Sequence, residues 1–312
     1  MQIWRDVDDV PADLGRTVVS IGNFDGVHLG HAHVLREARE TAERLGVDTV
    51  VAVTFDPHPM AVLRPEHAPP TLTSIGTRAR LLEHSGVDAI LVVGFDREVA
   101  GWSPQDFIDR ILVDALHAAA VVVGANFRFG AKAAGEVATL VEAGEARGFE
   151  TIGVALDGGP QVWSSTYVRQ CLATGDVAGA SEALGRAFTV RGIVVEGDKR
   201  GRELGYPTAN VPVPPVDAAP ADGVYAGWLT RLDTGERYPA AISVGTNPTF
   251  DGERERRVES YVLDRDDLEL YGVEVEVAFV DRLRGMVKFE GIEALVETMH
   301  DDVRRAREVL GG

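Results

Sequence analysis

The sequence predicts a two-domain chain, in which an α/β domain built on a parallel sheet precedes an antiparallel β-barrel. The length of 312 residues is typical of two domains. Up to about residue 186, apolar runs of strand length alternate with segments of helical periodicity. Beyond it, strand-like runs follow one another directly. We therefore expect one domain over 1–186 and a second over 187–312.

In the first half, strand and helix patterns alternate. The predicted strands are 17–21, 49–54, 88–93, 119–123 and 150–155, and the predicted helices are 31–45, 75–84, 104–116, 135–147 and 166–173. This alternation is typical of a parallel sheet with helices on both faces. Ligands bind such sheets at the carboxyl ends of the strands, so residues that directly follow a strand are candidates for the site.

The second half contains strand patterns with no helices between them. The predicted strands are 189–195, 223–231, 238–244, 257–263 and 273–280, with a proline-rich connection at 212–220 and a final helix at 291–309. Successive strands without crossover helices indicate an antiparallel sheet. Closure into a barrel would remove its free edges.

Composition narrows the class of protein. The net charge of −18 argues against binding to nucleic acid or to an anionic membrane. The single cysteine, Cys171, excludes an internal disulfide and fits a reducing compartment. The acidic N-terminus lacks a signal-peptide core and no apolar run is long enough to cross a bilayer, so we expect a cytoplasmic protein. A homo-oligomer is left open.

The segment GNFDGVHLGH, at 22–31, lies where the first predicted strand turns into a helix. A helix N-terminus offers free N–H groups and a positive dipole, which favour phosphate binding. The glycines let a nucleotide approach the backbone, and His28 and His31 can add charge or hydrogen bonds. Since the chain has neither a P-loop nor a G-x-G-x-x-G fingerprint, nucleotide binding would depend on this segment. The histidine pair could instead hold a metal, but no further ligand pattern accompanies it.

Three more polar segments occupy comparable positions. FDPHP at 55–59 and GANFRFG at 124–130 each follow a predicted strand, and SSTYVR at 164–169 opens a predicted helix. Each alone could be a turn or a helix cap. Because the carboxyl ends of parallel strands meet at one edge of the sheet, the segments together predict one cleft.

The second half carries a segment rich in glycine and charge, GDKRGRELGYPTAN, at 197–210. Backbone N–H groups of such a loop can wrap a nucleotide. Thr208 and Asn210 offer neutral oxygens that suit a Mg²⁺ ion already bound to phosphates. Glu259 alternates with apolar residues on a predicted strand and could act as general base toward an alcohol. The alternatives are a turn at 207–210 and a surface glutamate.

These segments carry a family resemblance in the first half. That half resembles the FMN adenylyltransferase module of bacterial FAD synthetases, which has a Rossmann-like nucleotidyltransferase fold. The resemblance implies catalysis by His28 and His31. It implies nucleotide contacts by Gly22, Asn23, Phe24, Asp25, Ser164, Ser165, Thr166 and Arg169, and flavin contacts by Phe55, Asp56, His58, Pro59, Asn126, Phe127 and Phe129. The resemblance also implies metal contacts around 55–59 and 126–129. Some members carry Asp at the position of Asn126, and an amide there cannot supply the same anionic metal ligand.

The second half is similar to riboflavin kinases, which are six-stranded Greek-key barrels; the PTAN match at 207–210 is the most specific. The resemblance implies that Glu259 is the catalytic base, that Thr208 and Asn210 hold Mg²⁺, and that Arg284 lies near the flavin. It implies nucleotide contacts by Gly197, Lys199, Gly201, Thr208 and Asn210.

Together the two resemblances imply an enzyme that phosphorylates riboflavin to FMN and then adenylylates FMN to FAD. Its substrates and products would be riboflavin, FMN, FAD, ATP, ADP and pyrophosphate, with Mg²⁺ as cofactor. Three alternatives are an enzyme with one live activity, a flavin-sensing protein with a decayed site, and a nucleotidyltransferase for another substrate. A nucleotidyltransferase for another substrate would leave the barrel unexplained. A decayed site would show substitutions among the motif residues, and these residues are all present.

Overall fold

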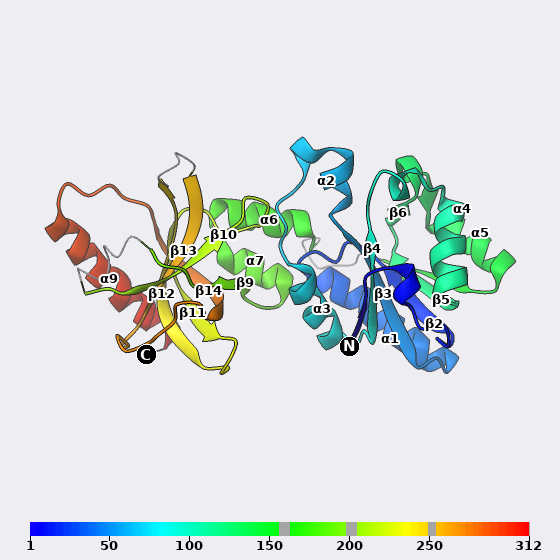
Figure 1. Ribbon diagram of the computed structural model, residues 1–312, viewed down its shortest axis with the longest axis horizontal. Helices are drawn as coiled ribbons and strands as arrows, with labels where there is room; N and C mark the ends of the chain where they lie inside the picture. The colour runs from blue at the N-terminus through cyan, green and yellow to red at the C-terminus, as the bar shows by residue number, and fades with distance from the viewer. Residues whose placement is uncertain (156–162, 198–204, 249–253, 312) are drawn as a thin grey trace. The chain divides into compact units, whose positions relative to one another are not determined.

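The computed structural model describes residues 1–155, 163–197, 205–248 and 254–311. The chain forms two compact units, Met1–Ser164 and Ser165–Gly312 (Figure 1). This division precedes the predicted domain boundary because helices α6 (Ser165–Thr174) and α7 (Val177–Leu184) pack with the second unit. For example, the amide of Ala221 donates to the carbonyl of Leu172. Sequence patterns assign α6 to the first half because it follows that half's last strand.

The first unit is built on the predicted parallel sheet, with the strand order β1-β4-β3-β2-β5-β8 in its described residues. The strands are β1 (Gln2–Trp4), β2 (Thr17–Ile21), β3 (Thr49–Asp56), β4 (Ala89–Gly94), β5 (Ala118–Gly124) and β8 (Glu150–Val154). They are almost wholly apolar because both faces of the sheet are covered. Strand β1 was not predicted, since three residues are too few to show a period.

Alternate residues of each strand face opposite layers. Val18 packs toward helices α1 and α3, whereas Val19 packs toward the layer that contains α4 and α5. The helices are α1 (Leu29–Leu45), α2 (Pro59–Leu63), α3 (Ile75–His84), α4 (Pro104–Phe107) and α5 (Val137–Arg147), with a two-stranded ribbon of β6 (Arg128–Phe129) and β7 (Gly135–Glu136). The helix predicted at 104–116 forms as α4 followed by a π-helical segment, Ile108–Ala115. Apolar spacing alone does not separate these two windings over so few turns.

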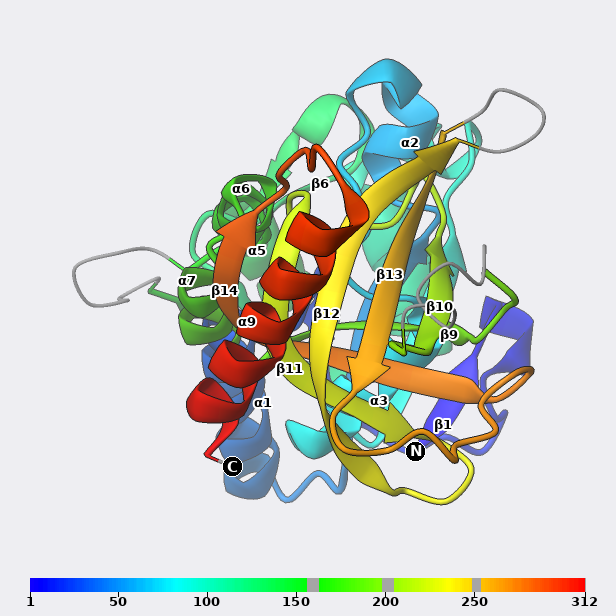
Figure 2. The same cartoon turned by 90° about the vertical axis from the view of Figure 1, so that its left-hand side faces the viewer.

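The second unit is the antiparallel barrel (Figure 2). The strand order is β10-β13-β12-β11-β14-β9 among the described residues, and a bridge between Val195 and Asn210 joins the two edges, so the barrel is nearly closed. The strands are β9 (Phe188–Ile193), β10 (Thr208–Val213), β11 (Gly223–Arg231), β12 (Arg237–Pro248), β13 (Arg254–Val262) and β14 (Glu274–Gly285).

Strand β10 was not predicted as a strand. Its sequence, TANVPV, lacks strand-like alternation, and it becomes extended because it pairs with β13 along its whole length. The proline-rich connection predicted at 212–220 therefore begins inside a strand. A proline is tolerated there because β10 lies at the edge of its sheet.

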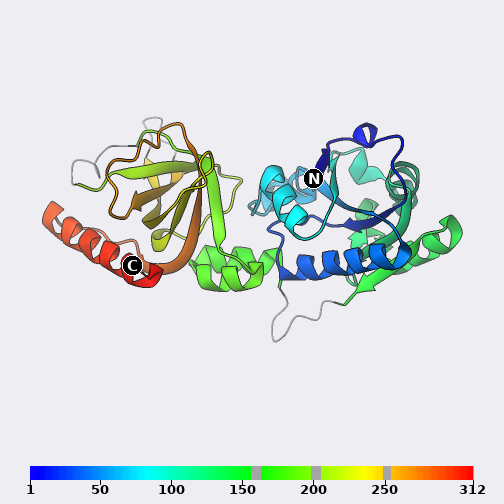
Figure 3. The ribbon, with the colours of Figure 1, turned by 90° about the horizontal axis from the view of Figure 1, so that it is seen from below.

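The final helix, α9 (Ile292–Leu310), lies along one side of the barrel, where it is drawn in red (Figure 3). Its buried Ala306 packs on Val224 and Ala241 of the barrel, with Val303 beside them. This covers one patch of the barrel's outer face. No helix in the described parts of the chain is long and apolar enough to span a membrane.

Candidate functional site

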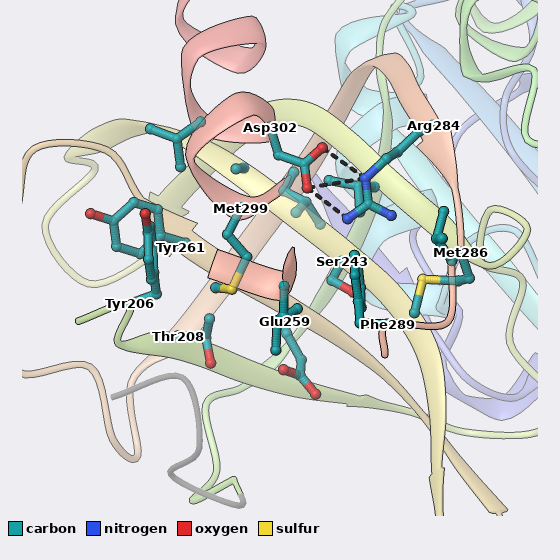
Figure 4. Close-up of a pocket in the computed structure, with 16 residues that line it drawn as sticks. Tyr206, Thr208, Ser243, Glu259, Tyr261, Arg284, Met286, Phe289, Met299 and Asp302 are labelled. Atoms are coloured by element: carbon teal, nitrogen blue, oxygen red, sulfur yellow. Dashed lines mark hydrogen bonds and ion pairs between the residues drawn. The ribbon is translucent and has the colours of Figure 1, made fainter. Parts of the chain in front are cut away.

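The second unit contains a cavity of about 260 Å³ between the barrel and α9 (Figure 4). Its walls are mostly apolar, and they are formed by Val224, Ala241, Ile242, Met286, Val287, Phe289, Leu295, Met299 and Val303. Polar side chains lie at its two ends. Thr208 and Glu259 lie close together at one end, and the pair Arg284 and Asp302 lies at the other.

Strand register sets this arrangement. Asn210, Glu259, Ser243, Val224 and Arg284 form one row across five strands, because each lies opposite the next in the antiparallel pairing. Directly opposed residues project to the same face of a sheet. Register alone therefore places the predicted base and the predicted flavin-contacting arginine on one face, three strands apart.

Asn210 and Thr208 are held together beside Glu259. Nδ2 of the buried Asn210 donates to the carbonyl oxygen of Thr208 at 3.0 Å and to its Oγ1 at 3.3 Å. Gly197 packs against this amide so closely that a Cβ there would lie 2.6 Å from Nδ2. Glycine is therefore needed at 197 for the chain to pass Asn210. Lys199 and Gly201 lie outside the described residues.

Residues to which the sequence analysis gave no role complete the lining of the cavity. The Tyr206 ring meets the edge of Tyr261, with 5.0 Å between the ring centroids, and burial raises the pKa of both phenols. Ser243 lies beside Glu259, and Asp302 comes from α9. The amphipathic pattern of α9 indicates a packed helix, but no sequence signal shows that it also forms a cavity wall.

In the first unit, the segment 22–31 forms the predicted turn from β2 into α1. Phe24 and Val27 have positive φ angles of 47° and 40°, so the backbone is held in an uncommon conformation for such residues. The carboxylate of Asp25 accepts hydrogen bonds from the amides of Leu72 and Thr73 at 2.9–3.0 Å. This anchor fastens the turn to the rest of the unit.

Arg78 lies beneath the same turn. Its Nη2 is 3.6 Å from Oδ1 of Asp25, and both side chains are almost fully buried. Its Nη1 donates to Oγ1 of Thr54 at 2.9 Å, and that hydroxyl donates to the carbonyl oxygen of Asn23. Sequence patterns gave no indication of Arg78, because it lies on the buried side of α3, where an apolar residue is the usual choice.

His28 and His31 lie at the start of α1. His28 is the N-cap, and its Nδ1 accepts the amide of His31 at 3.3 Å. The two rings stack with centroids 3.7 Å apart. A Cβ at Gly30 would lie 3.1 Å from the His28 ring and 3.2 Å from the carbonyl oxygen of Trp163, so glycine leaves room for the ring.

His31 is neutral near pH 7. Burial first, then the nearby His28 and Arg78, lowers its pKa well below the ordinary value of 6.5. In the part of the chain that the structure describes, its Nδ1 is buried and has no hydrogen-bond partner. A neutral imidazole can take part in hydrogen bonds but carries no full charge.

This shift predicts a pH dependence of stability. Because the folded pKa lies below the unfolded one, the contribution of His31 is complete above about pH 6.5 and is lost as the pH falls toward the folded pKa. Between about pH 7.5 and about pH 5.5, the unfolding midpoint of the wild type should fall more steeply than that of His31→Asn. His33→Asn, on the same helix, serves as control. Parallel profiles for wild type and His31→Asn would contradict the shift.

Side-chain contacts connect the segment 22–31 to the segment 55–59, and connect the segment 55–59 to the segment 124–130. The side-chain nitrogen Nδ2 of Asn23 lies 3.3 Å from Nε2 of His58. The ring of Phe55 contacts Phe107, which contacts Phe129, which stacks on Phe127. Of the other predicted residues, Gly22 follows β2, Asp56 is exposed at the end of β3, Pro59 opens α2, and Asn126 is exposed in the turn after β5.

The remaining predicted residues are near the division between the units. Ser164 ends the first unit, and Ser165, Thr166 and Arg169 lie in the first turns of α6 in the second. Within the described ranges, no group of three His, Cys, Asp or Glu side chains could hold a metal ion. The histidine pair therefore has no third ligand of this kind among those residues.

Comparison with known proteins identifies the family. The family model for FAD synthetase matches residues 10–166, and the model for riboflavin kinase matches residues 184–310. A bifunctional riboflavin kinase/FMN adenylyltransferase of Escherichia coli (strain K12) is 37% identical over 297 residues, covering 94% of this chain and 93% of that protein. A protein of the same description from Listeria monocytogenes is 35% identical, covering 97% and 93%.

The fold is also known along the whole chain. A solved structure described as a macrolide-efflux protein from Streptococcus pneumoniae is 31% identical, with a TM-score of 0.87 and 98% of both chains covered. That description belongs to the other protein, whereas both family models and the curated relatives agree on flavin chemistry. The chain belongs to the bifunctional riboflavin kinase/FMN adenylyltransferase family, and it converts riboflavin to FMN and FMN to FAD.

Proposed function

We propose that riboflavin lies in the cavity of the second unit with its ribityl 5′-hydroxyl at Glu259. Glu259 takes the hydroxyl proton, and the oxygen attacks the γ-phosphorus of ATP, giving FMN and ADP. The observation that carries this proposal is the position of Glu259 at the polar end of an apolar cavity, beside Thr208 and Asn210. Apolar walls suit the flat flavin ring, and the polar end suits the phosphates.

We propose that Thr208 and Asn210 hold a Mg²⁺ ion that arrives with ATP. The donor set fits, because both hydrogen bonds of the Asn210 amide to Thr208 use Nδ2 and leave its oxygen for other contacts. Two neutral oxygens suit a hard cation that keeps waters and phosphate oxygens as its other ligands. When bound, the ion neutralises the charge of the transferred phosphoryl group.

Replacing Asn210 with alanine should therefore raise the Mg²⁺ concentration that gives half-maximal kinase activity. A titration of FMN formation against Mg²⁺ at fixed ATP measures this. The Mg²⁺ dependence of FMN adenylylation in the same chain is the internal control and should stay as in the wild type. An unaltered kinase titration would argue against ligation by Asn210.

In the first unit, we propose that the phosphate of FMN attacks the α-phosphorus of ATP and that pyrophosphate leaves. His28, His31 and the N–H groups that open α1 stabilise the charge that develops on the α-phosphate. The neutral state of His31 supports a hydrogen-bonding role. Gly22, Asn23, Phe24 and Asp25 shape the turn. Together with Ser164, Ser165, Thr166 and Arg169, they stay predicted ATP contacts.

We further propose that FMN lies against the aromatic cluster of Phe55, Phe107, Phe127 and Phe129. Flat aromatic rings stack favourably, and this cluster connects two of the predicted motifs. Asp56, His58, Pro59 and Asn126 would border the ring. Sequence reasoning missed Phe107. Its ring lies between Phe55 and Phe129, but the residue belongs to neither of the segments 55–59 and 124–130.

A chromatographic flavin assay tests both activities. One tube starts from riboflavin with ATP and Mg²⁺, and a parallel tube starts from FMN. We expect the first tube to form FMN and then FAD, and the second tube to form FAD. FMN alone would restrict catalysis to the barrel, and no product would favour a flavin-binding protein. The cytoplasmic location, the domain limits at 186 and 187, and a homo-oligomer stay predictions.

A further inference from the structure

One end of the second unit's cavity is formed by an ion pair between Arg284 of β14 and Asp302 of α9 (Figure 4). Nε of Arg284 lies 2.8 Å and 3.1 Å from the two carboxylate oxygens, and Nη2 lies 2.7 Å from Oδ2. The side chain of Asp302 is 7% exposed. A buried carboxylate is strongly unfavourable without a paired cation, so each side chain holds the other in place.

The guanidinium of Arg284 is held by several contacts, and some of its N–H groups are not used in them. Its Nη1 donates to the carbonyl oxygen of Gly285 at 3.0 Å, and Cζ lies 5.9 Å from the ring centre of Phe289. A guanidinium has five N–H groups. Since these bonds use Nε and one N–H of each terminal nitrogen, a second N–H on each of Nη1 and Nη2 is left for a ligand.

We propose that Asp302 is a positioning residue of the kinase site, which holds Arg284 so that its remaining N–H groups meet the carbonyl oxygens of the flavin ring. This inference rests on the proposal that the cavity binds riboflavin. Arg284 and Glu259 lie in one row, three strand spacings or about 14 Å apart. The apolar walls between them suit the ring, whose carbonyl oxygens would meet Arg284 while its ribityl chain reaches Glu259.

The neighbouring residue provides a matched comparison. Asp301 lies on the same helix and forms an ion pair with Arg304, but both side chains are more than half exposed. Neither lines the cavity in the described part of the chain. Exposed pairs of this kind contribute little to stability. Asp301→Asn therefore removes the same charge from the same helix without touching Arg284.

The test compares kinase kinetics of Asp302→Asn, Asp302→Glu and Asp301→Asn in the full chain. In Asp302→Asn we expect the KM for riboflavin to rise about tenfold, since a hydrogen bond from a charged donor to the flavin is no longer held in place. The KM for ATP and kcat should stay within about twofold. Asp302→Glu should recover part of the loss, and Asp301→Asn should match the wild type.

A second variant keeps the proposal testable if Asp302→Asn folds poorly. Arg284→Lys retains the charge but cannot form the two-pronged pair, so it should raise the riboflavin KM similarly. In the double variant, which combines Asp302→Asn with Arg284→Lys, the two increases in the riboflavin KM should not add. Equal riboflavin KM values for Asp302→Asn and Asp301→Asn would overturn the proposal. A joint change of both KM values and kcat would also overturn it, since that indicates general damage.

The proposed site can fail separately from this inference. If Glu259→Gln keeps kinase activity, the assignment of the cavity fails. If Glu259→Gln is inactive while Asp302→Asn behaves like the wild type, only the positioning role of Asp302 fails.

Discussion

Replacing Glu259 with glutamine is expected to lower the rate of FMN formation by about 10²- to 10⁴-fold, the usual contribution of a general base. Glutamine keeps the size of the side chain but cannot accept the hydroxyl proton. FMN adenylylation should be unchanged, because its proposed residues lie on other elements. The measurement is the initial rate of each reaction, started separately from riboflavin and from FMN, with flavins separated by chromatography.

The matched control is Glu274→Gln. Glu274 is a carboxylate on β14 of the same barrel, where it accepts a hydrogen bond from Arg191 at 2.8 Å and is half exposed. This variant should retain kinase activity. Near wild-type FMN formation by Glu259→Gln would remove Glu259 from the role of base. Loss of activity in both variants would point to damage of the barrel.

Replacing His28 with alanine should have the opposite effect on the two reactions. We expect FAD formation from FMN to fall by about 10²- to 10³-fold, the typical loss when one contact to a developing negative charge is removed. FMN formation from riboflavin should continue, so FMN should accumulate. A single time course from riboflavin, with FMN and FAD quantified at each point, shows both effects.

His33→Ala is the control for this experiment. His33 lies on α1, two residues beyond His31, and its Nδ1 contacts Nη2 of Arg36 at 2.6 Å. It shares the helix but not the turn that follows β2, so adenylylation should be kept. Since His28 also caps α1, unfolding of the His28 variant should be followed in parallel. Unchanged adenylylation by a folded His28→Ala variant would contradict its role at phosphate.

Much of the first unit could be predicted from the sequence. Buried parallel strands are continuous apolar runs, and each is set apart by polar turns and amphipathic helices, as at Thr17–Ile21. The position of the first motif followed from the same pattern, since a segment between a strand and a helix must lie at a carboxyl end. The role of Asp25 did not follow. The family resemblance implies a nucleotide contact by Asp25, which stays a prediction. The structure adds that its carboxylate accepts the backbone amide of Leu72, 47 residues away.

The barrel was harder to predict in detail. Five strands were recognised from their own sequences, but Thr208–Val213 becomes a strand through its partner rather than through its composition. The residues of the proposed catalytic end were recognised by their types, as Thr208, Asn210 and Glu259. No role was predicted for Ser243 beside Glu259 or for Asp302 at the other end of the cavity, because their positions depend on strand pairing and on the packing of α9.

The sequence by itself determined the two fold types, the order of the domains and the short segments that carry the chemistry. Each of these depends on residues close together in the chain, where apolar period, glycine spacing and residue type act locally. The tertiary structure decided which of these residues meet. Register across five strands placed Glu259 and Arg284 in one row. The packing of α9 supplied one wall of the cavity and brought Asp302 to Arg284. Such pairings depend on hydrogen bonds and burial between distant segments, which no local pattern encodes.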